Sequence, residues 1–248
     1  MTVSNTPAVL TAEWRHLVMA NYRIDPERLE PFVPAGTELD FHEGKTWVSV
    51  VGFMFLDTRV KGLAIPFHRD FEEINLRFYV RRKEHDEWRR GVVFIREIVP
   101  RAAIAFLARK LYNENYIALP TRNRRDTDTE GNLALVRYEW FFRERWNSIE
   151  AQVSGAPAPL KEGSEEQFIA EHYWGYATQK DGSTVEYRVE HPSWNVWRVE
   201  EATVDVDVAQ LYGQTFVEPL AVKPDTVFVA DGSSISVSPG SARFGKPA

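Results

Sequence analysis

FHRDFEEINLRFYVRR, residues 67–82, is the stretch that decides the fold. From Glu73 onward its polar and apolar side chains alternate strictly, and a period of two predicts a β-strand with two unlike faces. The faces consist of Ile74, Leu76, Phe78 and Val80 on one side, and of Glu73, Asn75, Arg77, Tyr79 and Arg81 on the other. In an open sheet the polar row would contact water, whereas in a closed sheet it would line an internal binding site. We expect the closed arrangement.

The sequence on either side of this strand predicts three hairpins. They join residues 38–42 to 46–60, the opening strand to 92–99, and 173–179 to 183–190 across the turn signal Asp181-Gly182. Within the strand at 46–60, Gly52 is expected to mark a bulge or bend. Because hairpins pair strands antiparallel, the sheet is predicted to be mainly antiparallel.

Further segments are interpreted from composition. Residues 121–131 are polar throughout and predict an exposed turn, residues 154–163 predict a loop, and Asp231-Gly232 predicts a turn between the last two strands. The clearest helix is predicted over residues 102–111, which are mostly apolar at their start. Shorter helices are expected after the capping residues Asp25 and Ser164.

Composition limits the class of protein. The chain has 248 residues, a formal net charge of −6 and no cysteine. Its acidic balance argues against nucleic acid or an anionic membrane as a partner, and no apolar run reaches the length of a membrane span. We therefore expect a soluble, cytoplasmic protein with a flexible tail over residues 1–10 and a single domain over residues 11–248. A homo-oligomer is compatible with the sequence.

Several kinds of chemistry find no support in the motifs. The six histidines have no familiar metal spacing, and the chain has no G-x-S-x-G elbow, phosphate loop or dinucleotide fingerprint. We expect neither a metal nor a cofactor. Glu73 and Arg77 share one face, where they form either a structural ion pair or a site for a carboxylate or carbonyl ligand. Glu97 on the neighbouring strand is a second candidate carboxylate, and Trp174 belongs to an aromatic segment that could form the wall of a pocket.

The chain also resembles the YqjF-like family of uncharacterised bacterial proteins, a distant relative of acetoacetate decarboxylase. The resemblance extends over nearly the whole chain and rests on Met19-Ala20-Asn21-Tyr22, Val51-Gly52-Phe53, residues 68–77, Ala108-Arg109 with Tyr116, and Tyr173-Trp174-Gly175-Tyr176. It implies a largely antiparallel barrel with an internal active site.

The resemblance also implies roles for individual residues. Glu73 corresponds to a glutamate of the decarboxylases and Arg109 to an arginine, but Tyr116 stands where the decarboxylases have their Schiff-base lysine. A phenol cannot form an imine, so no lysine-dependent decarboxylation is expected. Lys110 is the nearest amine, six residues before Tyr116; a shifted alignment that would let it replace the lysine stays open.

The sequence therefore predicts an α+β protein, mainly an antiparallel β-barrel of the acetoacetate-decarboxylase-like kind with a few short helices. Its predicted function is to bind a small carbonyl or carboxylate compound in the lumen. The residues leave open whether acid/base chemistry follows, or whether the protein only binds or senses its ligand. The assigned site residues are Glu73 and Tyr116 for acid/base chemistry, and Arg77, Arg109, Asn75, Tyr79, His68 and Trp174 for ligand contact.

Overall fold

The computed structural model describes residues 8–64, 69–102, 113–240 and 243–245. Its strands are β1 (Leu10–Ile24), β2 (Glu38–Leu39), β3 (Thr46–Val60), β4 (Leu63–Ala64), β5 (Phe71–Glu84), β6 (Glu87–Val99), β7 (Tyr116–Ala118), β8 (Thr121–Thr127), β9 (Leu133–Phe142), β10 (Arg145–Pro159), β11 (Trp174–Thr178), β12 (Thr184–Glu190), β13 (Asn195–Asp205) and β14 (Thr226–Pro239). The described part of the chain is thus mostly strand, as predicted.

The helices in the described residues are short. They are α1 (Pro26–Leu29), η1 (Glu30–Phe32), α3 (Glu165–Ala170), α4 (Val208–Leu211), η2 (Gln214–Phe216) and α5 (Val217–Leu220). None of the helices in these ranges is long and apolar enough to cross a membrane. The helix predicted over residues 102–111 falls, after Ala102, outside the described residues.

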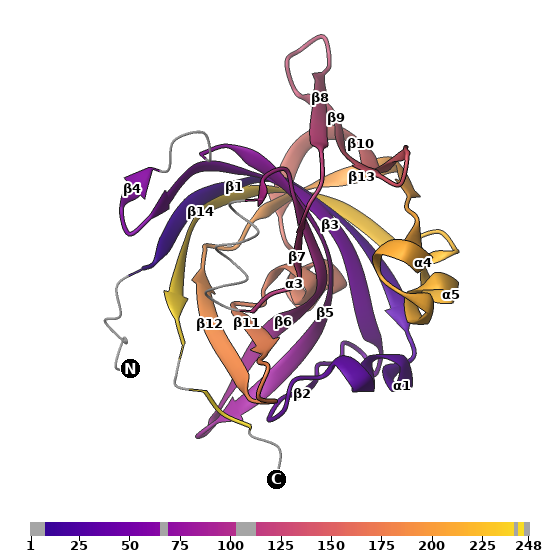
Figure 1. Ribbon diagram of the computed structural model, residues 1–248. Helices are drawn as coiled ribbons and strands as arrows, with labels where there is room; N and C mark the ends of the chain where they lie inside the picture. Colours follow the sequence, from indigo (N-terminus) through magenta and orange to yellow (C-terminus); the bar gives the residue numbers. More distant parts are fainter. Residues whose placement is uncertain (1–7, 65–68, 103–112, 241–242, 246–248) are drawn as a thin grey trace.

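Strand pairing follows a ring. Hydrogen bonds lead from β1 through β3, β5, β6, β11 and β12 to β14, and β14 pairs again with β1. Most of these pairs are antiparallel, but β11 runs parallel to β6. Figure 1 shows these strands curving around α3, which lies inside the ring. Burial is nearly continuous along β3 and β5, so both faces of these two strands are covered over most of their length.

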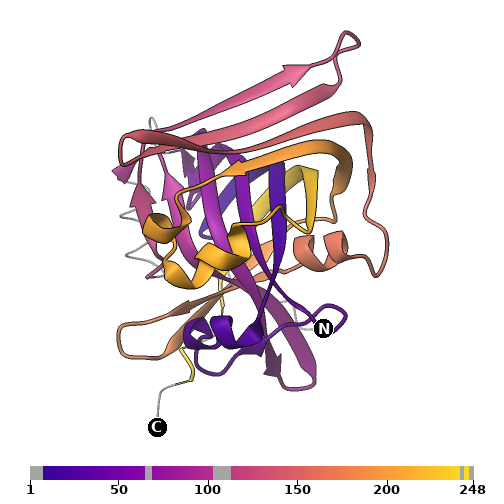
Figure 2. The ribbon, with the colours of Figure 1, turned by 90° about the vertical axis from the view of Figure 1, so that its right-hand side faces the viewer.

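A second layer covers part of the outer face. The sheet continues from β14 through β13, β10, β9 and β8, and these strands cross over one side of the ring (Figure 2). Tyr138 of β9 and Ile149 of β10 pack in the same core as Val50 and Ile74 of the ring, together with residues of α4, η2 and α5. Burial on both sides explains why the ring strands are so rich in apolar residues.

Gly52 lies beside a bulge, as predicted. It is opposite Val18 on one side and Ile74 on the other, and the ladder with β1 is irregular directly next to it, between Arg15 and Val18. A Cβ atom at this position would lie 2.8 Å from the Tyr138 ring and 3.0 Å from Ile149. Besides lying next to the bulge, the glycine therefore allows the second layer to approach the ring closely.

Two of the three predicted hairpins are confirmed and one is wrong. β5 pairs with β6, and β11 pairs with β12. Residues 38–39 form β2, but β2 pairs with the end of β5 and not with β3. The turn at residues 43–45 does reverse the chain, because His42 and Lys45 exchange backbone hydrogen bonds, but the pairing does not continue into β2, which bonds to the open polar groups at the end of β5.

Three loop or turn predictions are wrong in whole or in part: residues 128–131 do form an exposed turn and residues 160–163 a loop, but the residues before each of them, and Asp231-Gly232, lie within strands. The polar segment from Thr121 to Thr127 forms β8, and β10 extends to Pro159. Gly232 lies inside β14 with φ of +79°, next to an irregular register of β1 between Arg15 and Val18. A Cβ atom on Gly232 would lie 2.0 Å from the carbonyl oxygen of Trp14, so this glycine permits the irregularity without ending the strand.

The two helix caps form as predicted. Asp25 accepts a hydrogen bond from the backbone N–H of Glu27 at the start of α1. Ser164 accepts one from the backbone N–H of Gln167 at 3.2 Å, at the start of α3. The cap fixes the beginning of the helix whose Phe168, Ile169 and Ala170 are buried inside the ring.

Loss of the α3 cap should be measurable. We expect Ser164→Ala to lower the free energy of unfolding by about 1 kcal/mol, because one backbone donor of the helix loses its partner. Ser164→Asp, which restores an acceptor, should retain most of the stability. Urea unfolding of the three proteins measures the difference, and equal stability of the alanine and aspartate variants would contradict the capping role.

Candidate functional site

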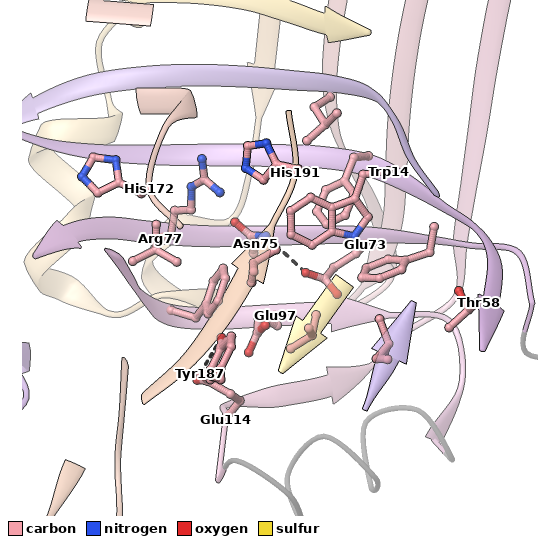
Figure 3. A pocket seen from close by; sticks show the side chains of 18 of the residues that line it. Trp14, Thr58, Glu73, Asn75, Arg77, Glu97, Glu114, His172, Tyr187 and His191 are labelled. Carbon is pink, nitrogen blue, oxygen red and sulfur yellow. Dashed lines mark hydrogen bonds between the residues drawn. The ribbon is translucent and has the colours of Figure 1, made fainter. Parts of the chain in front are cut away.

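The polar row of β5 faces a cavity of about 190 Å³. Aromatic side chains form much of its wall, including Trp14, Phe53, Phe55, Phe71, Trp174 and Trp194. Figure 3 shows the polar side chains that reach into this space. The labelled ones are Thr58, Glu73, Asn75, Arg77, Glu97, Glu114, His172, Tyr187 and His191, and Tyr116 also lines the cavity. A mainly apolar pocket with a few convergent polar groups is typical of a small-molecule site.

Strand register brings the carboxyl groups together. Asn75 of β5 lies opposite Glu97 of β6, and Glu97 lies opposite Tyr116 of β7. Glu114 immediately precedes β7 and accepts a hydrogen bond from the Tyr187 hydroxyl of β12 at 3.0 Å. Residues that are far apart in the sequence thus form one cluster, which we call the carboxyl cluster: Glu73, Glu97 and Glu114 with Tyr116 and Tyr187.

Hydrogen bonds order this cluster. The Tyr116 hydroxyl donates to Glu73 Oε2 at 3.0 Å, and Asn75 Nδ2 donates to Glu73 Oε1 at 3.3 Å. Glu97 also forms a hydrogen bond with Tyr116. Since the single phenolic proton points to Glu73, a protonated Glu97 can donate to the same phenolic oxygen. Glu97 Oε2 has no hydrogen-bond partner among the described residues and is available to a ligand.

Burial raises the pKa of all three carboxyl groups. Loss of hydration raises the pKa of Glu73 to about 7, even though Tyr116 and Asn75 donate to it. Burial likewise raises the pKa of Glu114 to about 8. The pKa of Glu97 lies well above its usual value because of burial and of its negative neighbours Glu114 and Glu73. At neutral pH, Glu97 and Glu114 are therefore mainly neutral, while Glu73 exchanges its proton.

Arg77 lies apart from the carboxyl cluster in Figure 3. Its side chain is buried, and Nη2 donates to the Ile169 carbonyl of α3 at 3.3 Å. It is the only lysine or arginine among the described residues that line the cavity. No carboxylate in the described ranges lies within ion-pair distance of its guanidinium group. Its positive charge lowers the pKa of Glu73 across the cavity, and a buried cation with no carboxylate in direct contact favours binding of an anion.

Two histidines complete the polar lining. His172 Nε2 lies 3.1 Å from Asp40 Oδ2, and Arg90 Nε donates to the same oxygen at 2.7 Å. Burial lowers the pKa of His172 to about 4, so that its ring is neutral. His191 stacks on Trp194 with ring centroids 4.1 Å apart, which places it in the aromatic wall.

The structure brings together five of the eight site residues predicted from the sequence. Glu73, Asn75, Arg77, Tyr116 and Trp174 all line the cavity, although their roles toward a ligand stay predictions.

The other three predicted site residues lie elsewhere. Tyr79 is on the same face of β5 but is not among the lining residues, because it packs against Phe168 and His172 and its hydroxyl lies 2.6 Å from Ser49 Oγ. His68 and Arg109 lie outside the described residues, as does Lys110.

Sequence reasoning missed Glu114 and His172. Glu114 lies in the polar segment Tyr112-Asn113-Glu114-Asn115, which has no periodicity that could assign it to a face. His172 follows α3, and only the position of that helix inside the ring brings it to the cavity. The alternating pattern of β5, by contrast, was sufficient to find Glu73, Asn75 and Arg77.

Comparisons with known proteins agree with this architecture. Residues 11–234 match the model of the family DUF2071, described as an uncharacterized conserved protein. The uncharacterized protein YqjF of Bacillus subtilis (strain 168) is 26% identical over 235 residues, which cover 89% of this chain and 90% of YqjF.

Solved structures show the fold. The enduracididine biosynthesis enzyme MppR, complexed with the condensation product of pyruvate and imidazole 4-carboxaldehyde, has a TM-score of 0.64 and 13% identity, with 100% of this chain and 93% of that chain covered. Acetoacetate decarboxylase from Legionella pneumophila subsp. pneumophila str. Philadelphia 1 has a TM-score of 0.62 and 12% identity, with 98% and 91% covered. At these identities the likeness concerns the fold alone, which is acetoacetate-decarboxylase-like.

Proposed function

The chain belongs to the DUF2071 family of uncharacterized conserved proteins, and we propose that it binds a small carbonyl or carboxylate compound in the cavity between Arg77 and the carboxyl cluster. One observation carries this proposal: a mainly apolar, largely enclosed space contains one buried cation and three buried carboxyl groups. Burying so many ionisable groups costs folding stability, and such groups cluster at functional sites. A core that was filled only for stability would be expected to be apolar.

The proposal includes a closed barrel. The ring of pairings from β1 to β14 and back to β1 supports this interpretation, because each of these strands has a neighbour on both sides. Closure would explain why the polar row of β5 faces an internal space and not water. We also retain residues 11–248 as one domain, since ring and second layer share a continuous core.

Each polar group has a role in this proposal. Arg77 holds an anionic group of the ligand through its guanidinium fork. Glu73, with a pKa of about 7, accepts or returns a proton. When Glu73 is protonated, the Tyr116 hydroxyl can turn from Glu73 to the ligand, so that Tyr116 and the neutral Glu97 beside it donate hydrogen bonds to a carbonyl oxygen at the other end. The chemistry we propose is acid/base chemistry without a Schiff base, because in the resemblance to the decarboxylases Tyr116 stands where they have their lysine.

The MppR structure supports the choice of ligand class. That enzyme is complexed with a condensation product of pyruvate, and pyruvate combines a carboxylate with a neighbouring carbonyl group. In this chain Arg77 would bind the carboxylate of such a ligand. A non-catalytic binding or sensor protein would use the same contacts, so kinetics and not geometry must separate the two functions.

Ligand-induced stabilisation tests the proposal. We expect at least one acid from a panel of hexanoate, 2-hydroxyhexanoate and 2-oxohexanoate to raise the melting temperature. A ligand at 100 times its Kd should add about 2.7 kcal/mol of stability. Glu73→Gln should raise the Kd of this ligand about tenfold, since one polar contact of the cluster changes. If none of the three acids stabilises the protein, the proposal fails.

Glu72 provides a matched control. It lies one residue away but outside the cavity lining, where it accepts hydrogen bonds from Thr121 and Asn123. Glu72→Gln should therefore keep the full ligand-induced shift, and an equal loss in both variants would place the effect outside the cavity. If an enzyme assay detects turnover of the bound acid, Glu73→Gln should abolish turnover more strongly than binding, whereas a sensor shows no turnover at all.

A further inference from the structure

His172 has a fixed orientation and a fixed tautomer. Its side chain is only 1% exposed, and its ring packs between Tyr79 at 4.7 Å and Phe168 at 5.0 Å. Nε2 faces Asp40 Oδ2 at 3.1 Å. A carboxylate can only accept, so Nε2 must carry the ring proton and Nδ1 must carry a lone pair.

Asp40 is held as a carboxylate. Although burial alone would raise its pKa, hydrogen bonds from His172 and Arg90 hold the pKa of Asp40 below its usual value. The Arg90 guanidinium donates to it at 2.7 Å. Since Asp40 keeps its negative charge and Arg90 balances it, His172 stays in the neutral form that donates through Nε2. Asp40 and Arg90 therefore fix the orientation of the His172 ring and leave Nδ1 without a proton.

His172 Nδ1 is buried and has no hydrogen-bond partner within the described part of the chain. The residue lines the cavity, and Figure 3 shows its ring beside Arg77. Arg77 and His172 also contact the same Tyr79 ring, with the guanidinium carbon 5.6 Å from its centroid. At one end of the cavity a cation thus lies near a buried acceptor that no group of the described residues uses.

We infer that His172 Nδ1 accepts a hydrogen bond from a hydroxyl group of the ligand whose carboxylate Arg77 holds, so that the ligand is a hydroxy acid. This inference rests on the proposed function and specifies its ligand. A 2-hydroxy acid carries a donor directly beside its carboxylate. The corresponding 2-oxo acid presents a carbonyl oxygen there, which is an acceptor facing another acceptor, and the unsubstituted acid leaves Nδ1 unpaired.

Three acids of equal chain length test the inference. We expect titration calorimetry to give 2-hydroxyhexanoate a Kd about five- to tenfold lower than that of hexanoate, the effect of one buried hydrogen bond. 2-Oxohexanoate should bind no better than hexanoate. Equal affinity for hexanoate and its 2-hydroxy derivative would overturn the inference while leaving the proposed function intact. If neither acid binds, the proposed function fails, and the inference fails with it.

Two substitutions of His172 distinguish the role of Nδ1 from that of Nε2. The amide of His172→Gln reaches the position of Nε2 and keeps a donor for Asp40, but it provides no acceptor at the position of Nδ1. The shorter amide of His172→Asn provides the acceptor and lacks the bond to Asp40. The ratio of the Kd of hexanoate to the Kd of 2-hydroxyhexanoate should fall to about one in the glutamine variant. It should keep its original value in the asparagine variant. The reverse pattern would assign His172 a structural role only.

A spectroscopic measurement avoids dependence on the folding of variants. In the unmodified protein labelled with ¹⁵N-histidine, the Nδ1 signal of His172 should have the shift of an unprotonated ring nitrogen. Addition of 2-hydroxyhexanoate should move this signal in the direction of hydrogen bonding, and hexanoate should not. An Nδ1 that is protonated, or that responds equally to both acids, would contradict the inference.

Discussion

Glu114→Gln is expected to raise the free energy of unfolding by about 4–5 kcal/mol at pH 9 and to change it little at pH 4.5. The folded protein raises the pKa of Glu114 from 4.5 to about 8 because the carboxyl group is fully buried. A raised pKa means that the folded state holds the proton more tightly than the unfolded chain. Its contribution to stability is therefore complete below pH 4.5 and is lost as the pH rises to 8.

Glutamine mimics the protonated carboxyl group and has no proton to lose. Its amide oxygen can also accept the hydrogen bond that the Tyr187 hydroxyl gives to Glu114 Oε1. Denaturant unfolding of both proteins at several pH values measures the effect as a difference. His16 and His172 have pKa values lowered to about 4 by burial, and therefore destabilise both proteins as the pH falls below 6.5. Their contribution cancels in the difference.

An exposed glutamate provides the control for this experiment. Glu201 of β13 is exposed to solvent, so Glu201→Gln should shift the unfolding curve equally at pH 4.5 and pH 9. A difference between Glu114→Gln and the unmodified protein that stays constant with pH would show that Glu114 is not buried in a protonated form. The account of the carboxyl cluster as a set of neutral acids would then be wrong.

Arg77→Met is expected to weaken carboxylate binding about 100-fold, as loss of charge-assisted hydrogen bonds worth about 2–3 kcal/mol implies. The same substitution should not destabilise the protein. Arg77 is buried without an anionic partner in the described ranges, and its guanidinium group lies 3.8 Å from the sulfur of Met19. An apolar side chain of similar length fits these surroundings without the cost of burying a charge.

Titration with hexanoate and denaturant unfolding measure the two effects separately. Arg81 lies on the same face of β5, at the surface, where it pairs with Glu38 at 2.7 Å, and Arg81→Met should leave the affinity unchanged. Unchanged affinity in Arg77→Met would remove Arg77 from the proposed site. A large loss of stability would show instead that the guanidinium group holds α3 in place through Ile169.

The sequence predicted the central strand well because its environment repeats every two residues. Glu73, Asn75 and Arg77 were assigned to one face from alternation alone, and all three line the cavity. The same pattern could not show where the cavity ends. Tyr79 continues the polar row, but α3 covers it, and the position of that helix depends on contacts far along the chain.

Turn dipeptides predicted the structure less well than the alternation of polar and apolar residues did. Asp181-Gly182 connects β11 to β12 as predicted, whereas Asp231-Gly232 lies inside β14. Both pairs suit a turn locally, but the second meets an irregularity in β1 that only strand pairing reveals. Similarly, the polar composition of β8 suggested a turn because this strand pairs with β9 and is largely exposed. Sheet pairing therefore overrode local composition at these positions.

A crystal structure of the protein with bound hexanoate tests the central claim most directly. The account predicts the ligand inside the cavity, with its carboxylate on the Arg77 guanidinium group and its chain running toward the aromatic wall formed by residues such as Trp14 and Phe53. Hexanoate bound only at the outer surface, or with its carboxylate away from Arg77, would contradict it.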